Sequence, residues 1–131
     1  MYTVIMDFDH GEIRIPSDVI QALDIPLDVS YLVHRSNRQL AITRYLDHSI
    51  MTGEKRRGPP CRKSRIAKYW RGDVNAYCMT CMRTTLQLIG NLISGFNGSG
   101  IYALTGSKED LSGEPVILFD LAQATAFTTN Y

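Results

Sequence analysis

The residues of this chain best suited to chemistry are a dense run of positive charge and a spaced pair of cysteines. Between positions 55 and 71 lie eight lysines and arginines within seventeen residues, interleaved with Tyr69 and Trp70. Basic side chains bind phosphate groups, and aromatic rings stack on unpaired bases. The RRGPP stretch at 56–60 is a poor helix or strand and indicates an extended arm. This segment therefore predicts contact with double-stranded DNA.

The alternative is a solvated linker whose Trp70 packs on the core, because charge runs often form only soluble surface. The charge distribution along the chain favours the binding interpretation. Residues 1–34 hold six acids and one base, residues 35–71 hold eleven bases and two acids, and residues 72–131 hold five acids and two bases. The predicted DNA-binding residues are Arg14, Arg35, Arg38, Lys55, Arg56, Arg57, Arg62, Lys63, Arg65, Lys68 and Arg71.

The cysteines are spaced for a metal. Two of them form a C-x2-C pair, the knuckle geometry in which two thiolates hold one zinc ion, and a tetrahedral site needs two further ligands. The candidate zinc ligands are Cys61, Cys78, Cys81 and His48. The alternative is that the cysteines stay reduced and pack as small apolar residues, with no cofactor required.

Composition indicates a cytoplasmic protein. Three cysteines are too few, and odd in number, for the disulfide framework of a secreted domain. The N-terminus lacks the basic start and apolar centre of a signal peptide, and no stretch approaches the roughly 20 apolar residues that span a bilayer. We therefore expect no membrane partner.

Enzyme activity is not expected. The three histidines lie at 10, 34 and 48, and the sequence contains no nucleophile elbow, HExxH motif or phosphate loop. Asp7, Asp9 and His10 lie close together near a turn and offer ligands for a divalent ion. Acids beside a turn glycine commonly accept hydrogen bonds from the turn backbone instead.

Hydrophobic periodicity predicts a mainly β fold. Residues 2–6 and 12–15 have the alternation of two strands joined by a turn at 9–11, with Ile13 and Ile15 on one face. Pro16 ends the second strand, and Ser17 is a favourable N-cap for a short helix.

Further elements follow from the same patterns. In the first half of the chain, the expected elements are a helix limited by Pro26, strands at 29–34 and 39–45 around a turn at 35–38, and a helical turn or two from Arg62. In the second half, we expect strands at 84–90 and 101–104, with a flexible turn at 95–100 between them. One helical turn within 105–115 capped by Ser107, a buried strand at 115–121 and a short closing strand or helix within 122–131 should follow.

The N-terminal third resembles a known family. The frame Asp9, Gly11, Ile13, Ile15-Pro16, Val19-Ile20, Leu23, Ile25, Asp28, Tyr31 and LAITRY at 40–45 is similar to that of the AbrB/MazE/SpoVT regulators. The resemblance covers about residues 3–46 and implies a swapped-hairpin β-barrel built by a homodimer. DNA-binding members carry basic residues where this chain has Glu12, Ile20 and Gln21. The resemblance therefore implies a dimer scaffold, with the DNA contacts further along the chain.

These observations together predict three parts. They are an AbrB-like swapped-hairpin dimerisation domain at 1–46, a basic arm or linker at 47–76, and a second small β-rich unit at 77–131. The predicted function is that of a dimeric, AbrB-like transcription regulator that contacts DNA mainly through residues 55–71. The alternative is an antitoxin-like or scaffold dimer that binds a basic protein partner through its acidic N-terminal face and does not bind DNA.

Overall fold

The structure is a computed structural model that describes residues 1–24, 28–34, 37–43, 62–65, 69–70, 73–81, 83–111 and 113–126. Its elements are β1 (Tyr2–Asp7), β2 (Glu12–Pro16), α1 (Ser17–Leu23), β3 (Asp28–His34), β4 (Gln39–Thr43), β5 (Arg62–Arg65), β6 (Tyr69–Trp70), β7 (Asp73–Thr80), α3 (Arg83–Asn91), β8 (Ile101–Leu111), β9 (Glu114–Asp120), a 3-10 turn η1 (Leu121–Gln123) and β10 (Thr125–Ala126). The prediction of a mainly β fold is confirmed.

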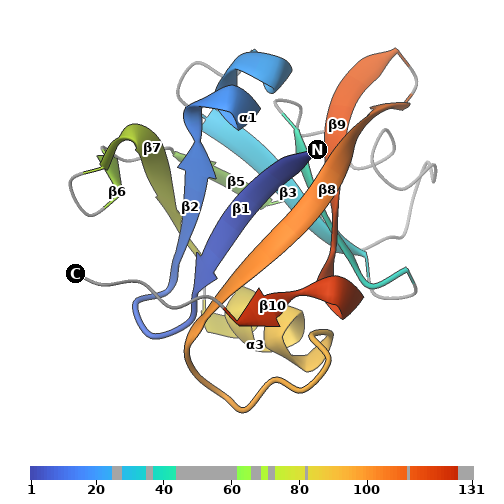
Figure 1. Ribbon diagram of the computed structural model, residues 1–131. Coiled ribbons are helices and arrows are strands. Elements are labelled where there is room, and N and C mark those ends of the chain that lie inside the picture. The colour runs from blue at the N-terminus through green and yellow to red at the C-terminus, as the bar shows by residue number, and fades with distance from the viewer. Residues whose placement is uncertain are drawn as a thin grey trace.

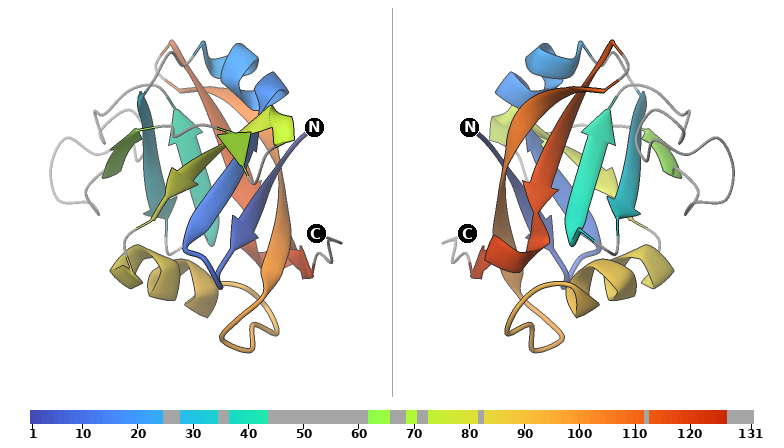
Figure 2. Two further views of the ribbon diagram at one scale, coloured as in Figure 1. Left: turned by 90° about the vertical axis from the view of Figure 1, so that its left-hand side faces the viewer. Right: turned by 90° about the vertical axis from the view of Figure 1, so that its right-hand side faces the viewer.

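The described strands form one ten-stranded sheet that curls around its apolar face (Figure 1). Along the sheet the strand order is β5-β3-β4-β9-β8-β1-β2-β7-β6, and β10 pairs with β8 outside this path. Figures 1 and 2 show α1 over one end of the curled sheet and α3 over the other. The two helices therefore close the ends of a half-barrel.

The N-terminal hairpin matches its prediction. β1 pairs with β2 in antiparallel register, with Ile5 opposite Arg14, and the intervening turn contains Gly11 at a left-handed φ of 68°. Ile13 and Ile15 are fully buried on one face of β2, as their alternation predicted. A glycine suits this turn because an L side chain rarely adopts a positive φ.

The short helix is also present, but its predicted cap is wrong. Pro16 occupies the N-cap position in an extended conformation with no side-chain cap hydrogen bond, and Ser17 is the first helical residue. The fixed φ of proline suits the junction between a strand and a helix, so a polar cap is not required. Val19 and Leu23 are buried one turn apart. The helix ends at Leu23, and the C-cap residue Asp24 adopts a left-handed φ of 52°.

The prediction of a strand at 84–90 is wrong, because these residues belong to helix α3. Thr85 and Ile89 are buried four residues apart, and Ile93 continues the same spacing just beyond the helix. The threonines favoured a strand in a short window, whereas the apolar spacing that extends to Ile93 is helical.

The helical turn predicted within 105–115 is also wrong, because β8 continues through these residues as far as Leu111. Glu109 lies opposite Val116 in the pairing with β9, and Ser107 donates to the Glu109 carboxylate at 3.3 Å instead of capping a helix. The turn-like residues of β8 follow the strand because β9 is strongly apolar and supplies their pairing partner. The predicted strand at 115–121 is confirmed as β9.

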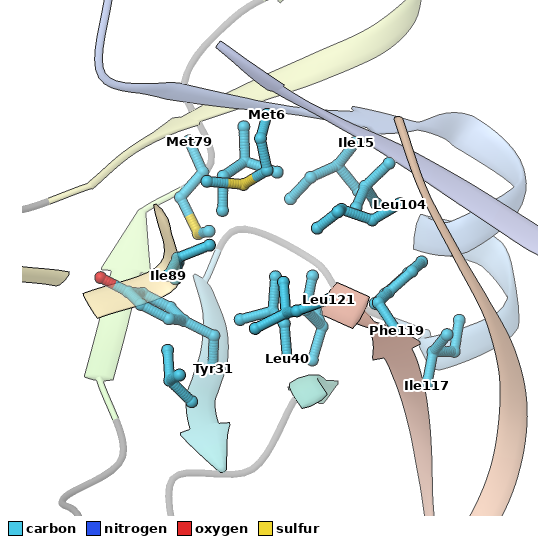
Figure 3. Packing of buried hydrophobic residues seen from close by; sticks show 14 of the residues in the cluster. Met6, Ile15, Tyr31, Leu40, Met79, Ile89, Leu104, Ile117, Phe119 and Leu121 are labelled. Carbon is cyan, nitrogen blue, oxygen red and sulfur yellow. The ribbon is translucent and has the colours of Figure 1, made fainter. Parts of the chain in front are cut away.

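Strands from both predicted β units alternate in the sheet, since β8 and β9 lie between β1 and β4. Their inner faces share one apolar cluster, which Figure 3 shows from close by. Fully buried members include Met6, Leu40, Met79, Leu104 and Phe119. A 45-residue unit buries little by itself. Within this chain, the later strands supply the missing cover.

Candidate nucleic-acid interface

Three of the predicted DNA-binding residues, Arg62, Lys63 and Arg65, lie on strand β5 at one end of the sheet order. Among the described strands, β5 pairs only with β3, and Arg62 lies opposite Tyr31. The helical turn predicted from Arg62 is wrong for residues 62–65. These residues have no apolar alternation of their own, so pairing with the backbone of β3 makes them a strand.

The basic segment, residues 55–71, contributes one strand to each end of the sheet. β6 pairs with β7 at the far end of the strand order, whereas β5 begins the order. β5 also contacts β7, because the curl of the sheet brings its two ends together (Figure 2). Residues from the basic segment therefore lie on both sides of the seam of the half-barrel.

Arg14 lies on β2 rather than at this seam. Its Cα is opposite Ile5 of β1 and Cys78 of β7, both of which are buried, and its own side chain is partly buried. The predicted site residues that lie outside the described residues are Arg35, Lys55, Arg56, Arg57, Lys68 and Arg71.

Arg38 is bound to the end of helix α3. Its Nε and Nη2 donate to the Leu92 carbonyl at 3.0 and 2.7 Å, and Nη2 also donates to Ser94 Oγ at 3.0 Å. Leu92 follows the last helical residue, where backbone carbonyls have lost their helical partners. The Arg38 carbonyl accepts from the Leu121 N–H at 2.9 Å. Arg38 therefore joins the β3–β4 turn to α3 and η1.

The two cysteines of the C-x2-C pair pack on different sides of the sheet. Cys78 is buried with Ala76 in a small cluster, whereas Cys81 packs against the main core. Residues three apart on an extended backbone point to opposite faces. Cys78 and Cys81 therefore belong to separate apolar clusters, and the other two predicted zinc ligands, Cys61 and His48, lie outside the described residues.

The protonation of Cys81 also bears on metal binding. Burial raises the pKa of its thiol from 9.0 to about 12, and a hydrogen bond with the Tyr31 side chain lowers the pKa in part. A thiol must lose its proton to bind zinc or to act as a nucleophile. At neutral pH, Cys81 is therefore a protonated thiol.

A second group of ligand-type side chains lies at the β1–β2 turn. Asp7, His10 and Glu12 each offer one possible metal-ligand atom, and these three atoms lie within 4.8 Å of one another. The fully buried Asp7 carboxylate accepts from the Asp9 and His10 N–H groups at 3.0 and 3.1 Å, and His10 Nδ1 lies 3.0 Å from Asp7 Oδ2. Asp9 accepts from the Gly100 N–H at 3.0 Å.

These contacts fit the turn interpretation of Asp7 and Asp9, because both carboxylates accept hydrogen bonds from backbone N–H groups. The sequence patterns pointed to Asp7, Asp9 and His10 but missed Glu12. Glu12 joins the group because it lies opposite Asp7 in the hairpin register. A prediction that the hairpin turn consists of residues 8–11 would have placed Asp7 opposite Glu12.

Comparison with protein-family models, with curated proteins and with solved structures found no match to this chain. In the part of the chain that the structure describes, no helix has the length and apolar character needed to cross a membrane.

Proposed function

We propose that this protein is a homodimeric regulator that binds double-stranded DNA through the basic segment 55–71. The observation that supports this most strongly is the position of β5. Three of its four residues are basic, and it lies at one end of the strand order rather than between two strands. Bases held at the end of a sheet offer repeated contacts to phosphate oxygens at low cost in backbone entropy.

The acidic N-terminal third has a different role in this proposal. Residues 1–34 have six acids against Arg14, and a surface of that sign repels DNA phosphates. The half-barrel that these residues help to build is then the scaffold, and β5 carries the contact. The resemblance to AbrB-like regulators supports a second copy, which would place two basic segments about one two-fold axis.

The test is the salt dependence of binding to a labelled duplex, measured by fluorescence anisotropy. Each phosphate contact contributes about 0.9 to the slope of log K against log salt concentration. Serine at Arg56, Arg57, Arg62 and Lys63 together should therefore reduce the slope by about 3.6. The matched control is Lys108→Ser, which removes an exposed base on β8 that is followed by two acids.

A slope unchanged in the fourfold variant would contradict contact through the basic segment. Recovery of one stoichiometric protein partner, with no binding of the duplex at low salt, would instead support the antitoxin-like alternative. The oligomeric state is tested separately, by sedimentation of the free protein.

A further inference from the structure

The first residue of helix α3, Arg83, is an exposed base in a neutral stretch of the chain. Its side chain is exposed, and the first turn of α3 contains no acid. The sequence contains no aspartate or glutamate from position 74 to position 108. No neighbour along the chain therefore neutralises this guanidinium.

The fold carries Arg83 to the end of the sheet where β5 begins. β7 ends at Thr80, and the thiol of Cys81 shares a hydrogen bond with the side chain of Tyr31 on β3. Tyr31 lies opposite Arg62, the first residue of β5. Only Met82 separates Cys81 from Arg83, so the start of α3 follows directly from this contact.

The arrangement of the elements agrees with this path. Helix α3 contacts β3, the strand that pairs with β5. Figure 2 shows α3 below β5 and β7 in its left-hand view. The end of β5 that enters from the basic stretch 55–57 and the start of α3 are therefore at the same end of the half-barrel.

We propose that Arg83 is a further DNA-contacting residue, which binds a backbone phosphate next to those bound by β5. This inference rests on the proposed function. An arginine forks to phosphate oxygens and fixes the position of a duplex without reading its sequence. Arg83 would add a phosphate contact on the helix that closes this end of the half-barrel.

Acidic residues flank the β1–β2 turn, which lies next to the segment between β7 and α3. The Gly11 carbonyl of the β1–β2 turn accepts from the Cys81 N–H at 2.9 Å, so Asp9 and Glu12 belong to a segment that also approaches the end of β7. Their charges repel phosphate. DNA that contacts Arg83 should therefore follow the β5 side of β7, and Glu12→Gln should strengthen binding.

The experiment compares Arg83→Met with Arg83→Lys in the full chain, by anisotropy of the same duplex over a tenfold range of salt. The methionine variant should lower the slope of log K against log salt concentration by about 0.9. Over a tenfold range of salt, the Kd of this variant should therefore rise by a factor about eight times smaller than the Kd of the wild type. The lysine variant keeps a cation and should keep the slope. Lys108→Met is the matched control, because Lys108 is an exposed base in the second half of β8. Figure 1 shows that β8 runs from the end of the half-barrel near α3 to the opposite end.

The outcomes separate this inference from the proposed function. If Arg83→Met keeps the wild-type slope while the fourfold variant of the basic segment loses it, Arg83 is not a contact and only this inference fails. If the wild-type protein shows no salt-dependent binding of the duplex, both proposals fail. Thermal melting of Arg83→Met should match the wild type, and equal melting assigns a lost slope to the missing contact.

Discussion

Replacement of Arg38 by methionine tests whether this arginine serves the fold or the DNA surface. Methionine keeps an unbranched apolar chain but removes the donors to the Leu92 carbonyl and to Ser94 Oγ, at 2.7 to 3.0 Å. A hydrogen bond from a charged group contributes about 1.5–3 kcal/mol, and a cation near a helix C-terminus adds about 0.3–1 kcal/mol. Because Arg38 is only partly buried, we expect Arg38→Met to lower the free energy of unfolding by about 2 kcal/mol.

Urea denaturation measures this change, and two further variants test its cause. Lysine at position 38 keeps the charge but cannot fork, so it should recover about half of the loss. Arg38 has a left-handed φ of 52°, which glycine adopts without strain. Arg38→Gly should therefore be more stable than Arg38→Ala by about 1 kcal/mol.

The comparison with Arg83 decides between the two roles. Arg38→Met should lose stability and keep the salt slope of DNA binding, whereas Arg83→Met should keep stability and lose slope. If Arg38→Met retains its unfolding midpoint while its slope falls by about 0.9, the guanidinium serves a phosphate and the structural role argued from its contacts is refuted.

Three further comparisons test the described structure. Gly106→Ala should lower the free energy of unfolding by about 3 kcal/mol, because the added Cβ would meet the backbone of β9. At Gly98 an added Cβ has open space but the φ is 98°, so Gly98→Ala should lower the same free energy by only about 1 kcal/mol. Urea denaturation measures both changes. Asp7→Ala should cost more than His10→Ala, because the Asp7 side chain is 0% exposed and that of His10 is 56% exposed. Cys81 should alkylate at pH 8 about a thousandfold more slowly than an ordinary thiol, as mass spectrometry can measure.

The pKa of Cys81 also predicts the alkaline limit of stability. The folded thiol has a raised pKa of about 12 against an ordinary 9.0, so the unfolded chain loses this proton first. The contribution of this thiol to the free energy of unfolding is therefore complete below pH 9 and is lost as the pH rises toward 12. The loss is at most about 1.4 kcal/mol per pH unit, and Cys81→Ser should weaken this dependence in urea titrations.

The N-terminal elements could be predicted because their determinants are local. The alternation of Ile13 and Ile15, the turn at Gly11 and the position of Pro16 each act within a few residues. The same local rules failed at α3 and β8. Thr85 suits a strand until its spacing to Ile89 and Ile93 is included, and Ser107 suits a helix cap until β9 pairs with it.

The candidate site shows the same division between local composition and distant contact. A run of charge identifies a basic segment, but it cannot tell which arginine has a partner far along the chain. Arg38 is a predicted phosphate ligand by its sign alone, yet its guanidinium is held by Leu92, 54 residues away. Arg83 has no basic neighbours in sequence, so charge patterns do not single it out, although Cys81 and Tyr31 connect its segment to Arg62. The proximity of the segment that contains Arg83 to the strand that pairs with β5 is thus found only when the contacts of β3 are known.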